Sequence, residues 1–194
     1  MSDQGKSAGR PARAEPGGDA VQSAVVRPCV VLIGPPGSGK TTVGHSLATL
    51  LGVELRDTDR AIELQEGRSV SDIFVDQGEP RFRELERAEV ASSLVSHSGV
   101  LSLGGGAVMD PASAAALAGH TVVFLDVGIA DAAARVGFNQ SRPLLVVNPR
   151  AQWTRMMDIR RPTYERLATL TVLTSGRTPQ DIAAEIAQRV KQTS

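Results

Sequence analysis

Residues 34–41 read Gly-Pro-Pro-Gly-Ser-Gly-Lys-Thr, a complete phosphate-binding loop of the form G-x-x-x-x-G-K-[ST]. The apolar run 29–33 precedes the loop and predicts a buried strand. Apolar residues recur at helical spacing after the loop, at Val43, Leu47, Leu50 and Leu51. Backbone N–H groups at a strand-to-helix turn can point at an anion, Lys40 can reach phosphate oxygens and Thr41 can offer its hydroxyl to Mg²⁺. The pattern favours a nucleotide site over a plain glycine-rich turn.

Two carboxylates follow the next predicted strand, residues 53–56, at Asp57 and Asp59. One of them can hold Mg²⁺ through water, and the other can accept a proton from a substrate hydroxyl. Asp59 can equally serve only as the cap of the next helix. The phosphate loop favours the catalytic interpretation, because phosphoryl transfer needs metal ligands and a positioned nucleophile.

Three glycines and several arginines are further candidates for binding an anionic ligand. Gly104-Gly105-Gly106 ends the third predicted strand and is either a tight turn or an oxyanion site made of bare backbone N–H groups. Arginine suits bidentate capture of carboxylate or phosphate. The arginines considered are Arg83, Arg142, Arg160 and Arg161. Arg83 lies four residues after Glu79, so a surface ion pair is its alternative role.

The composition is that of a globular protein with balanced charge. The 194 residues include 21 basic and 21 acidic side chains, which gives no bulk reason to expect nucleic acid or an anionic membrane as partner. The single cysteine, Cys29, cannot form an internal disulfide and suits a reducing compartment. No apolar run has the length of a membrane span, and no apolar signal core is present at the N-terminus. We expect a cytoplasmic protein.

The predicted strands alternate with helices. Residues 1–24 are rich in Gly, Ala, Ser and Pro and are expected to form a disordered tail before a single domain, 25–194. The remaining strands are predicted at 100–103, 121–126 and 170–173. One helix is predicted to follow the phosphate loop and end at Gly52, one to run through Ile62 and Leu64 to Gly67, and one to begin at Pro111. The others are predicted within 69–77 and around 79–96, 131–136, 150–168 and 179–190.

This alternation predicts an α/β fold with a parallel sheet covered on both faces. In the helix 79–96 an apolar face is predicted at Phe82, Leu85, Ala88, Ala91, Leu94 and Val95. Pro162 is expected to break or kink the helix 150–168. Ligands of parallel sheets bind beyond the carboxyl ends of the strands, so the phosphate loop, the acidic pair and the three glycines should meet at one edge.

Taken together, these motifs resemble the shikimate kinase family, within the nucleoside-monophosphate-kinase-like P-loop group. The resemblance covers nearly all of residues 29–190. It rests on motifs in the family order: residues 34–41, Asp57-Thr58-Asp59, Phe82-Arg83, Gly104-Gly105-Gly106-Ala107-Val108, Arg142-Pro143-Leu144-Leu145, and Arg160 before Pro162-Thr163-Tyr164. The phosphate loop alone indicates only the wider group, and the ordered set is what makes the resemblance specific.

The resemblance implies ATP-dependent phosphorylation of the 3-hydroxyl of shikimate, by a monomer with a three-layer P-loop fold, a five-stranded parallel sheet of order 2-3-1-4-5 and a mobile lid at about 137–149. It implies catalytic roles for Lys40, Asp59 and Arg142, and Mg²⁺ held near Thr41 and Asp57. The implied ATP contacts are Gly37, Ser38, Gly39, Lys40, Thr41, Thr42, Arg135, Arg142, Arg177 and Pro179. The implied shikimate contacts are Asp59, Arg83, Gly104, Gly105, Gly106 and Arg160. Arg160 is preferred to Arg161 because it lies two residues before Pro162, as in the family pattern.

Two other functions are compatible with parts of the pattern. A kinase of the same fold could act on another small polyol or acid such as gluconate, although the arginines and the three glycines favour a ring carboxylate. A nucleotide-binding regulatory module without catalysis is the other alternative, and the presence of Lys40, Thr41, Asp57, Asp59 and Arg142 argues against it. A GTPase switch is disfavoured because no Asn-Lys-x-Asp motif is present.

Overall fold

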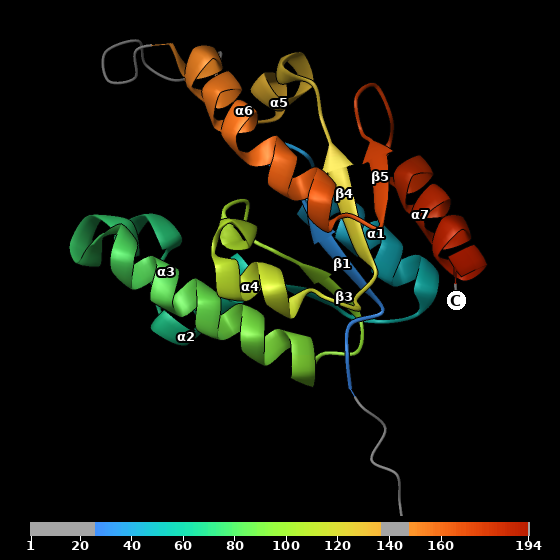
Figure 1. Cartoon of the computed structure of the whole chain (residues 1–194), viewed down its shortest axis with the longest axis horizontal. Coiled ribbons are helices and arrows are strands. Elements are labelled where there is room, and N and C mark those ends of the chain that lie inside the picture. The colour runs from blue at the N-terminus through green and yellow to red at the C-terminus, as the bar shows by residue number, and fades with distance from the viewer. Residues whose placement is uncertain (1–25, 137–147, 194) are drawn as a thin grey trace, which may run out of the picture.

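The computed structural model describes residues 26–136 and 148–193. Its central sheet has five parallel strands in the order β2-β3-β1-β4-β5 (Figure 1). The strands are β1 (Val30–Ile33), β2 (Leu55–Asp57), β3 (Val100–Ser102), β4 (Val122–Asp126) and β5 (Leu170–Leu173). The predicted sheet order is therefore confirmed. The predicted tail 1–24, residues 137–147 of the predicted lid, and Arg142 lie outside the described residues, and the division into a tail and one domain stays a prediction.

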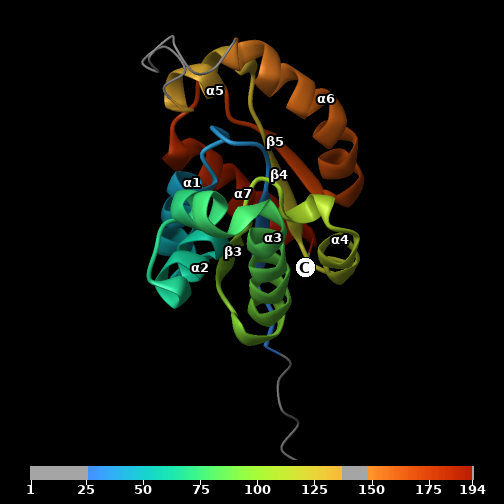
Figure 2. The same cartoon turned by 90° about the vertical axis from the view of Figure 1, so that its left-hand side faces the viewer.

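Helices cover both faces of this sheet, and in Figure 2 α1 and α6 lie on opposite sides of the strands. The helices are α1 (Lys40–Leu51), α2 (Thr58–Glu66), α3 (Val70–Ser96), the short 3₁₀ helix η1 (Ala107–Met109), α4 (Pro111–Ala116), α5 (Ile129–Val136), α6 (Pro149–Leu167) and α7 (Pro179–Thr193). Within the described ranges, no helix is both long and apolar enough to cross a lipid bilayer.

Alternate side chains of the central strands enter two separate cores, because successive residues of a strand point to opposite faces. In β1, Val31 and Ile33 pack with α3, η1 and α6, whereas Val30 and Leu32 pack with α1 and α7. All four side chains are buried, which explains why the strand is apolar at every position. The sheet is thus fixed from both sides, and its carboxyl edge is a rigid base for the loops that follow the strands.

A smaller apolar cluster holds α2 against α3. It consists of Ile62, Ile73, Phe82 and Leu85. The chain bends within α3 at Gly78, whose φ of 81° and ψ of 166° are not helical and are accessible essentially only to glycine. The predicted boundary between a short helix and the helix 79–96 is therefore present as this bend.

Two predictions about the helices are wrong in part. Helix α6 continues through Pro162 without a break, so the loss of one backbone N–H donor is tolerated within a helix packed on the sheet. In α3 the buried face contains Glu86, Glu89 and Ser93. Three residues of the predicted face are instead exposed: Ala88, Ala91 and Val95. The buried carboxylates are tolerated because Glu86 pairs with Arg83, and Glu89 pairs with Arg56 and accepts a hydrogen bond from Ser93.

Candidate active site

The phosphate loop lies between β1 and α1, and its carbonyl oxygens are held by its own Lys40 and by Arg135 of α5. Lys40 Nζ donates to the carbonyls of Gly34 and Pro35 at 2.9 and 3.2 Å. Arg135 Nη1 donates to the carbonyls of Gly37 and Ser38 at 3.2 and 3.3 Å. With these carbonyls held, the loop has a fixed backbone path around the site where an anion can bind.

The first turn of α1 supplies the donors for such an anion. Gly39 precedes the helix with a φ of 89°, a left-handed conformation that favours glycine. Because glycine has no side chain, Gly39 cannot cap the helix in the way that Ser or Asp does. The N–H groups of a helix's first turn have no partners within the helix, and together with the helix dipole they attract phosphate. Desolvation lowers the pKa of Lys40 to about 8, although Asp59 and Asp57 favour its charged form. A bound phosphate would strengthen that charged form further.

Asp57, at the end of β2, is the cap of α2. Its Oδ1 accepts hydrogen bonds from the backbone N–H groups of Asp59 and Arg60. Its Oδ2 accepts hydrogen bonds from Thr41 Oγ1 at 2.8 Å and from Ser102 Oγ at 3.0 Å. The alternative in which Asp59 caps this helix is therefore wrong, and the carboxylate of Asp59 is left for another role.

The three glycines after β3 bring the parts of the site together. A Cβ on Gly104 would lie 2.6 Å from Asp59 Oδ1 and 2.7 Å from Glu86 Oε1. On Gly105 it would lie 3.2 Å from Cδ of Pro36 in the phosphate loop, and on Gly106 it would lie 2.6 Å from Nη1 of Arg83. None of the three has a positive φ. Glycine is needed here because three other elements approach closely, and not because the turn is strained.

Asp59 is a half-buried carboxylate beside Gly104. Its Oδ1 is buried and has no hydrogen-bond partner among the described residues. Desolvation raises the pKa of Asp59 from 3.8 to about 6, with further contributions from the negative charges of Asp57 and Glu86. A carboxylate with this pKa accepts a proton more readily than an ordinary aspartate.

This pKa makes the stability of the free protein depend on pH. Because the folded-state pKa of Asp59 lies above 3.8, folding favours the protonated carboxyl. The stabilisation that this preference provides is complete below about pH 4 and is lost as the pH rises through about 6. Relative to the Asp59→Asn variant, the wild-type protein should therefore lose about 1 kcal/mol of unfolding free energy between about pH 5 and pH 8.

Urea unfolding of both proteins across this range measures the difference. Asp76→Asn, which changes an exposed aspartate paired with Arg68, is the matched control and should not reproduce the trend. A difference between wild type and Asp59→Asn that stays constant with pH would contradict the raised pKa.

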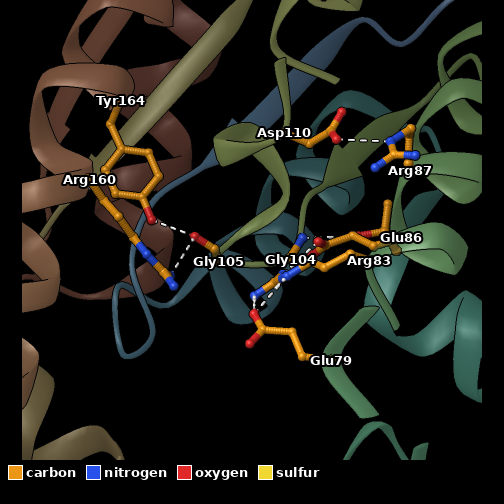
Figure 3. A network of polar contacts seen from close by, with 10 residues as sticks. Glu79, Arg83, Glu86, Arg87, Gly104, Gly105, Asp110, Arg160 and Tyr164 are labelled. Carbon is orange, nitrogen blue, oxygen red and sulfur yellow. Dashed lines mark hydrogen bonds and ion pairs between the residues drawn. The ribbon is translucent and has the colours of Figure 1, made fainter. Parts of the chain in front are cut away.

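Arg83 lies between two glutamates of its own helix (Figure 3). Its Nη1 contacts Glu86 at 2.6 Å, and that glutamate side chain is only 3% exposed. Its Nε and Nη2 contact Glu79 Oε1 at 3.2 and 3.0 Å, and Glu79 is 63% exposed. The ion pair with Glu79, given above as the alternative role of Arg83, is present, but the buried Glu86 is the partner that fixes the guanidinium beside Gly106.

The two adjacent arginines of α6 have different hydrogen-bond partners. Arg160 Nη1 donates to the Gly105 carbonyl at 3.2 Å, and the Tyr164 hydroxyl donates to the same oxygen (Figure 3). Arg161 instead pairs with Asp126 at the end of β4, at 2.6 and 2.9 Å. Of the two, Arg160 therefore lies at the turn formed by the three glycines.

The phosphate loop also borders a cavity of about 240 Å³. It is lined by Ser38, Gly39, Thr42, Val43, Arg135, Arg177, Pro179 and Ile182. Arg177 is held there by Glu185 at 2.6 Å, and Arg135 by Thr174. Six of the residues implied to contact ATP thus line one cavity: Ser38, Gly39, Thr42, Arg135, Arg177 and Pro179.

Sequence reasoning missed Glu86, Ser102 and Tyr164 as parts of this site. Glu86 could have been found from its spacing, because it lies four residues after Phe82 on the buried face of α3. Ser102 is the last residue of β3, at the edge where ligands of parallel sheets bind. The contact of Tyr164 joins residues 59 positions apart, and no local pattern indicates it.

Comparison with known proteins identifies the family. A family model described as shikimate kinase matches residues 36–191. The chain is 58% identical over 160 residues to a shikimate kinase of Salinispora arenicola, covering 82% of this chain and 96% of that protein. The chain belongs to the shikimate kinase family. A shikimate kinase of Thermobifida fusca is 56% identical over 84% of this chain and 95% of its own length.

Solved structures agree with this membership. The structure of an Acinetobacter baumannii shikimate kinase in complex with shikimate has a TM-score of 0.80 at 33% identity, over 87% of this chain and 95% of that one. A gluconokinase of Sinorhizobium meliloti has a TM-score of 0.50 at 16% identity, which shows a shared fold alone. The expectation that the chain is an enzyme of the shikimate kinase family, a kinase that uses ATP, is confirmed.

Proposed function

We propose that this chain transfers the γ-phosphoryl group of ATP to the 3-hydroxyl of shikimate at the edge of the sheet described above. The observation that carries the proposal is the turn at Gly104–Gly106, where Asp59, Arg83 and the phosphate loop each approach a different glycine. Family membership supports the reaction, and this geometry supports the assignment of roles to residues.

The acceptor would lie between two guanidinium groups and one carboxylate. Arg83 and Arg160 approach the three-glycine turn from α3 and α6 and would bind the ring carboxylate of shikimate. Asp59 would accept the proton of the 3-hydroxyl, and its raised pKa suits that step. Gly104, Gly105 and Gly106 would allow the ring to lie close to the backbone.

The nucleotide would lie across the phosphate loop. Residues 37–42, which include Lys40, would bind the phosphates. Arg135, Arg177 and Pro179 line the adjoining cavity that would hold the base. Arg142, which lies outside the described residues, is proposed to contact the phosphates of ATP.

A Mg²⁺ ion fits the chemistry of Thr41 and Asp57. The Thr41 hydroxyl and the Asp57 carboxylate lie 2.8 Å apart, and oxygen donors of this kind suit Mg²⁺. Among residues 26–136 and 148–193, no group of three or more His, Cys, Asp or Glu side chains could hold a metal, so the ion would depend on phosphate oxygens for further ligands. When bound, it supplies positive charge against the negative charge of the transferring group.

The reaction then balances simply. The 3-hydroxyl oxygen forms a bond to the γ-phosphorus as the bond from that phosphorus to the β-γ bridging oxygen breaks. The hydroxyl proton passes to Asp59, and ADP leaves. Lys40 and Arg142 stabilise the charge on the transferring group, while Arg83 and Arg160 hold the acceptor in line.

The test is an assay of acceptor-dependent ADP release with MgATP. Shikimate should support ADP release, whereas gluconate at the same concentration should not. Turnover with gluconate and none with shikimate would establish the rival kinase, and ATP binding without acceptor-dependent release would establish a regulatory module. That the protein is a cytoplasmic monomer stays a prediction.

Glu79 should oppose shikimate binding, because it occupies the Nε and Nη2 edge of Arg83 that a substrate carboxylate would use. An exposed ion pair of this kind is worth less than about 1 kcal/mol. Glu79→Gln should therefore lower the Kd for shikimate by about two- to fivefold. Isothermal titration calorimetry at fixed ionic strength measures this change.

Glu84→Gln is the matched control for Glu79→Gln. Glu84 is on the same helix, is equally exposed at 63%, and pairs with Arg81 instead of Arg83. The Glu84→Gln substitution alters the net charge by the same amount and should leave the Kd for shikimate unchanged. Equal shifts in both variants would show a general charge effect and contradict the competition at Arg83.

A further inference from the structure

Helix α6 contacts loops on both sides of the proposed active site. Near its start, Trp153 Nε1 donates a hydrogen bond to the Pro36 carbonyl of the phosphate loop at 3.2 Å. Near its end, Arg160 and Tyr164 donate to the Gly105 carbonyl (Figure 3). One rigid helix therefore fixes a backbone carbonyl in the nucleotide loop and another in the acceptor turn.

The contact of Trp153 with Pro36 completes the set of donors around the phosphate loop. Lys40 holds the two carbonyls before Pro36, and Arg135 holds the two after it. Trp153 is 7% exposed and lies in the apolar core formed with β1, β3 and β4. A buried indole N–H needs an acceptor, and the Pro36 carbonyl is the acceptor it has.

The two loops also touch each other through the same proline. The ring of Pro36 packs on Gly105, where an added Cβ would lie 3.2 Å from Pro36 Cδ. Trp153, Pro36, Gly105 and Tyr164 thus form a closed path of contacts that begins and ends on α6. A displacement of either loop must strain the other loop or the helix, because packed contacts of this kind leave little free space.

We propose that Trp153 is a positioning residue for the phosphate loop, and that α6 couples the nucleotide and acceptor sites through Trp153 and Tyr164. The proposal rests on the proposed function for the location of the two sites. A ligand that orders one of these loops lowers the cost of ordering the other, so the two ligands should bind with positive coupling. Trp153 itself contacts neither ligand in this account.

The test measures the Kd for MgADP by isothermal titration calorimetry, with and without saturating shikimate. In the wild-type protein, shikimate should tighten MgADP binding at least about threefold. Trp153→Phe keeps an aromatic ring but removes the N–H donor. It should weaken MgADP binding about fivefold, equivalent to ~1 kcal/mol, and bring the coupling factor close to one.

Two further variants separate positioning from general stability. Thr154→Ala removes the exposed side chain of the next residue, which donates a hydrogen bond to the Arg150 carbonyl of the same helix, and should leave both the Kd and the coupling unchanged. Tyr164→Phe removes one of the two donors to the Gly105 carbonyl, and it should reduce the coupling without weakening the binding of MgADP alone. This second variant tests the proposal even if Trp153→Phe does not fold.

The outcomes distinguish the proposal from the function on which it rests. A wild-type protein that binds neither MgADP nor shikimate would contradict the proposed function. A wild-type protein that binds both without coupling would overturn the role of α6. If Trp153→Phe and Tyr164→Phe lower the melting temperature but keep the wild-type Kd and coupling, their contacts are only structural and the proposal is wrong.

Discussion

Replacing Asp59 with asparagine is expected to lower kcat by about 10²–10⁴-fold, because general base catalysis contributes a factor of this size. Asparagine keeps the shape of the side chain but cannot accept the hydroxyl proton. The KM for shikimate should change much less, since Arg83 and Arg160 remain to bind the carboxylate. Initial rates of ADP release over a range of shikimate concentrations give both constants.

The same substitution should not destabilise the protein at neutral pH. Asp59 is ionised there although burial raises its pKa to about 6, so its charge is unfavourable to folding. Asp59→Asn should therefore unfold at a temperature equal to or above that of the wild type, while Asp76→Asn should keep wild-type turnover. A kcat within threefold of wild type in Asp59→Asn would show that this carboxylate only orients the acceptor.

Lys40→Met is expected to lower kcat by about 10²–10³-fold, the usual loss when one preorganised donor to a developing charge is removed. The ammonium of Lys40 lies within the phosphate loop and binds two of its carbonyls, so it can turn to the nucleotide without a movement of the backbone. Methionine keeps most of the length of the side chain but neither its charge nor its donors. Single-turnover kinetics with saturating MgATP and shikimate measure the chemical step.

Lys191→Met is the matched control, because it removes a lysine at the exposed C-terminal end of α7. It should retain wild-type turnover. Two carbonyls lose a partner in Lys40→Met, so its thermal unfolding should be compared with wild type before the rates are interpreted. A folded Lys40→Met protein with undiminished kcat would remove Lys40 from the catalytic machinery.

The parallel sheet could be predicted because its strands are short apolar runs separated by helices, whereas the order of its strands came from the family resemblance. β1 and β4 are buried on both faces, and such strands are apolar at almost every position. Of the break or kink predicted at Pro162, the break is absent because α6 packs on the sheet through Trp153, Met157 and Tyr164, and this burial outweighs the loss of one backbone hydrogen bond.

The site could be predicted only in part. Motifs placed the phosphate loop, Asp57, Asp59 and the three glycines at one edge because they follow strands that are parallel neighbours. The prediction of the buried face of α3 was partly wrong because it chose apolar residues such as Val95. Strict helical spacing would have placed Glu86 and Glu89 on that face instead. Contacts such as Trp153 with Pro36 join residues 117 positions apart and depend on tertiary packing.

A crystal structure of the chain with MgADP and shikimate would test the assignment of the acceptor site most directly. The account predicts the shikimate carboxylate against Arg83 and Arg160, and the 3-hydroxyl beside Asp59 facing the β-phosphate on residues 34–41. Shikimate bound with its carboxylate away from both arginines, or its 3-hydroxyl out of reach of Asp59, would contradict it.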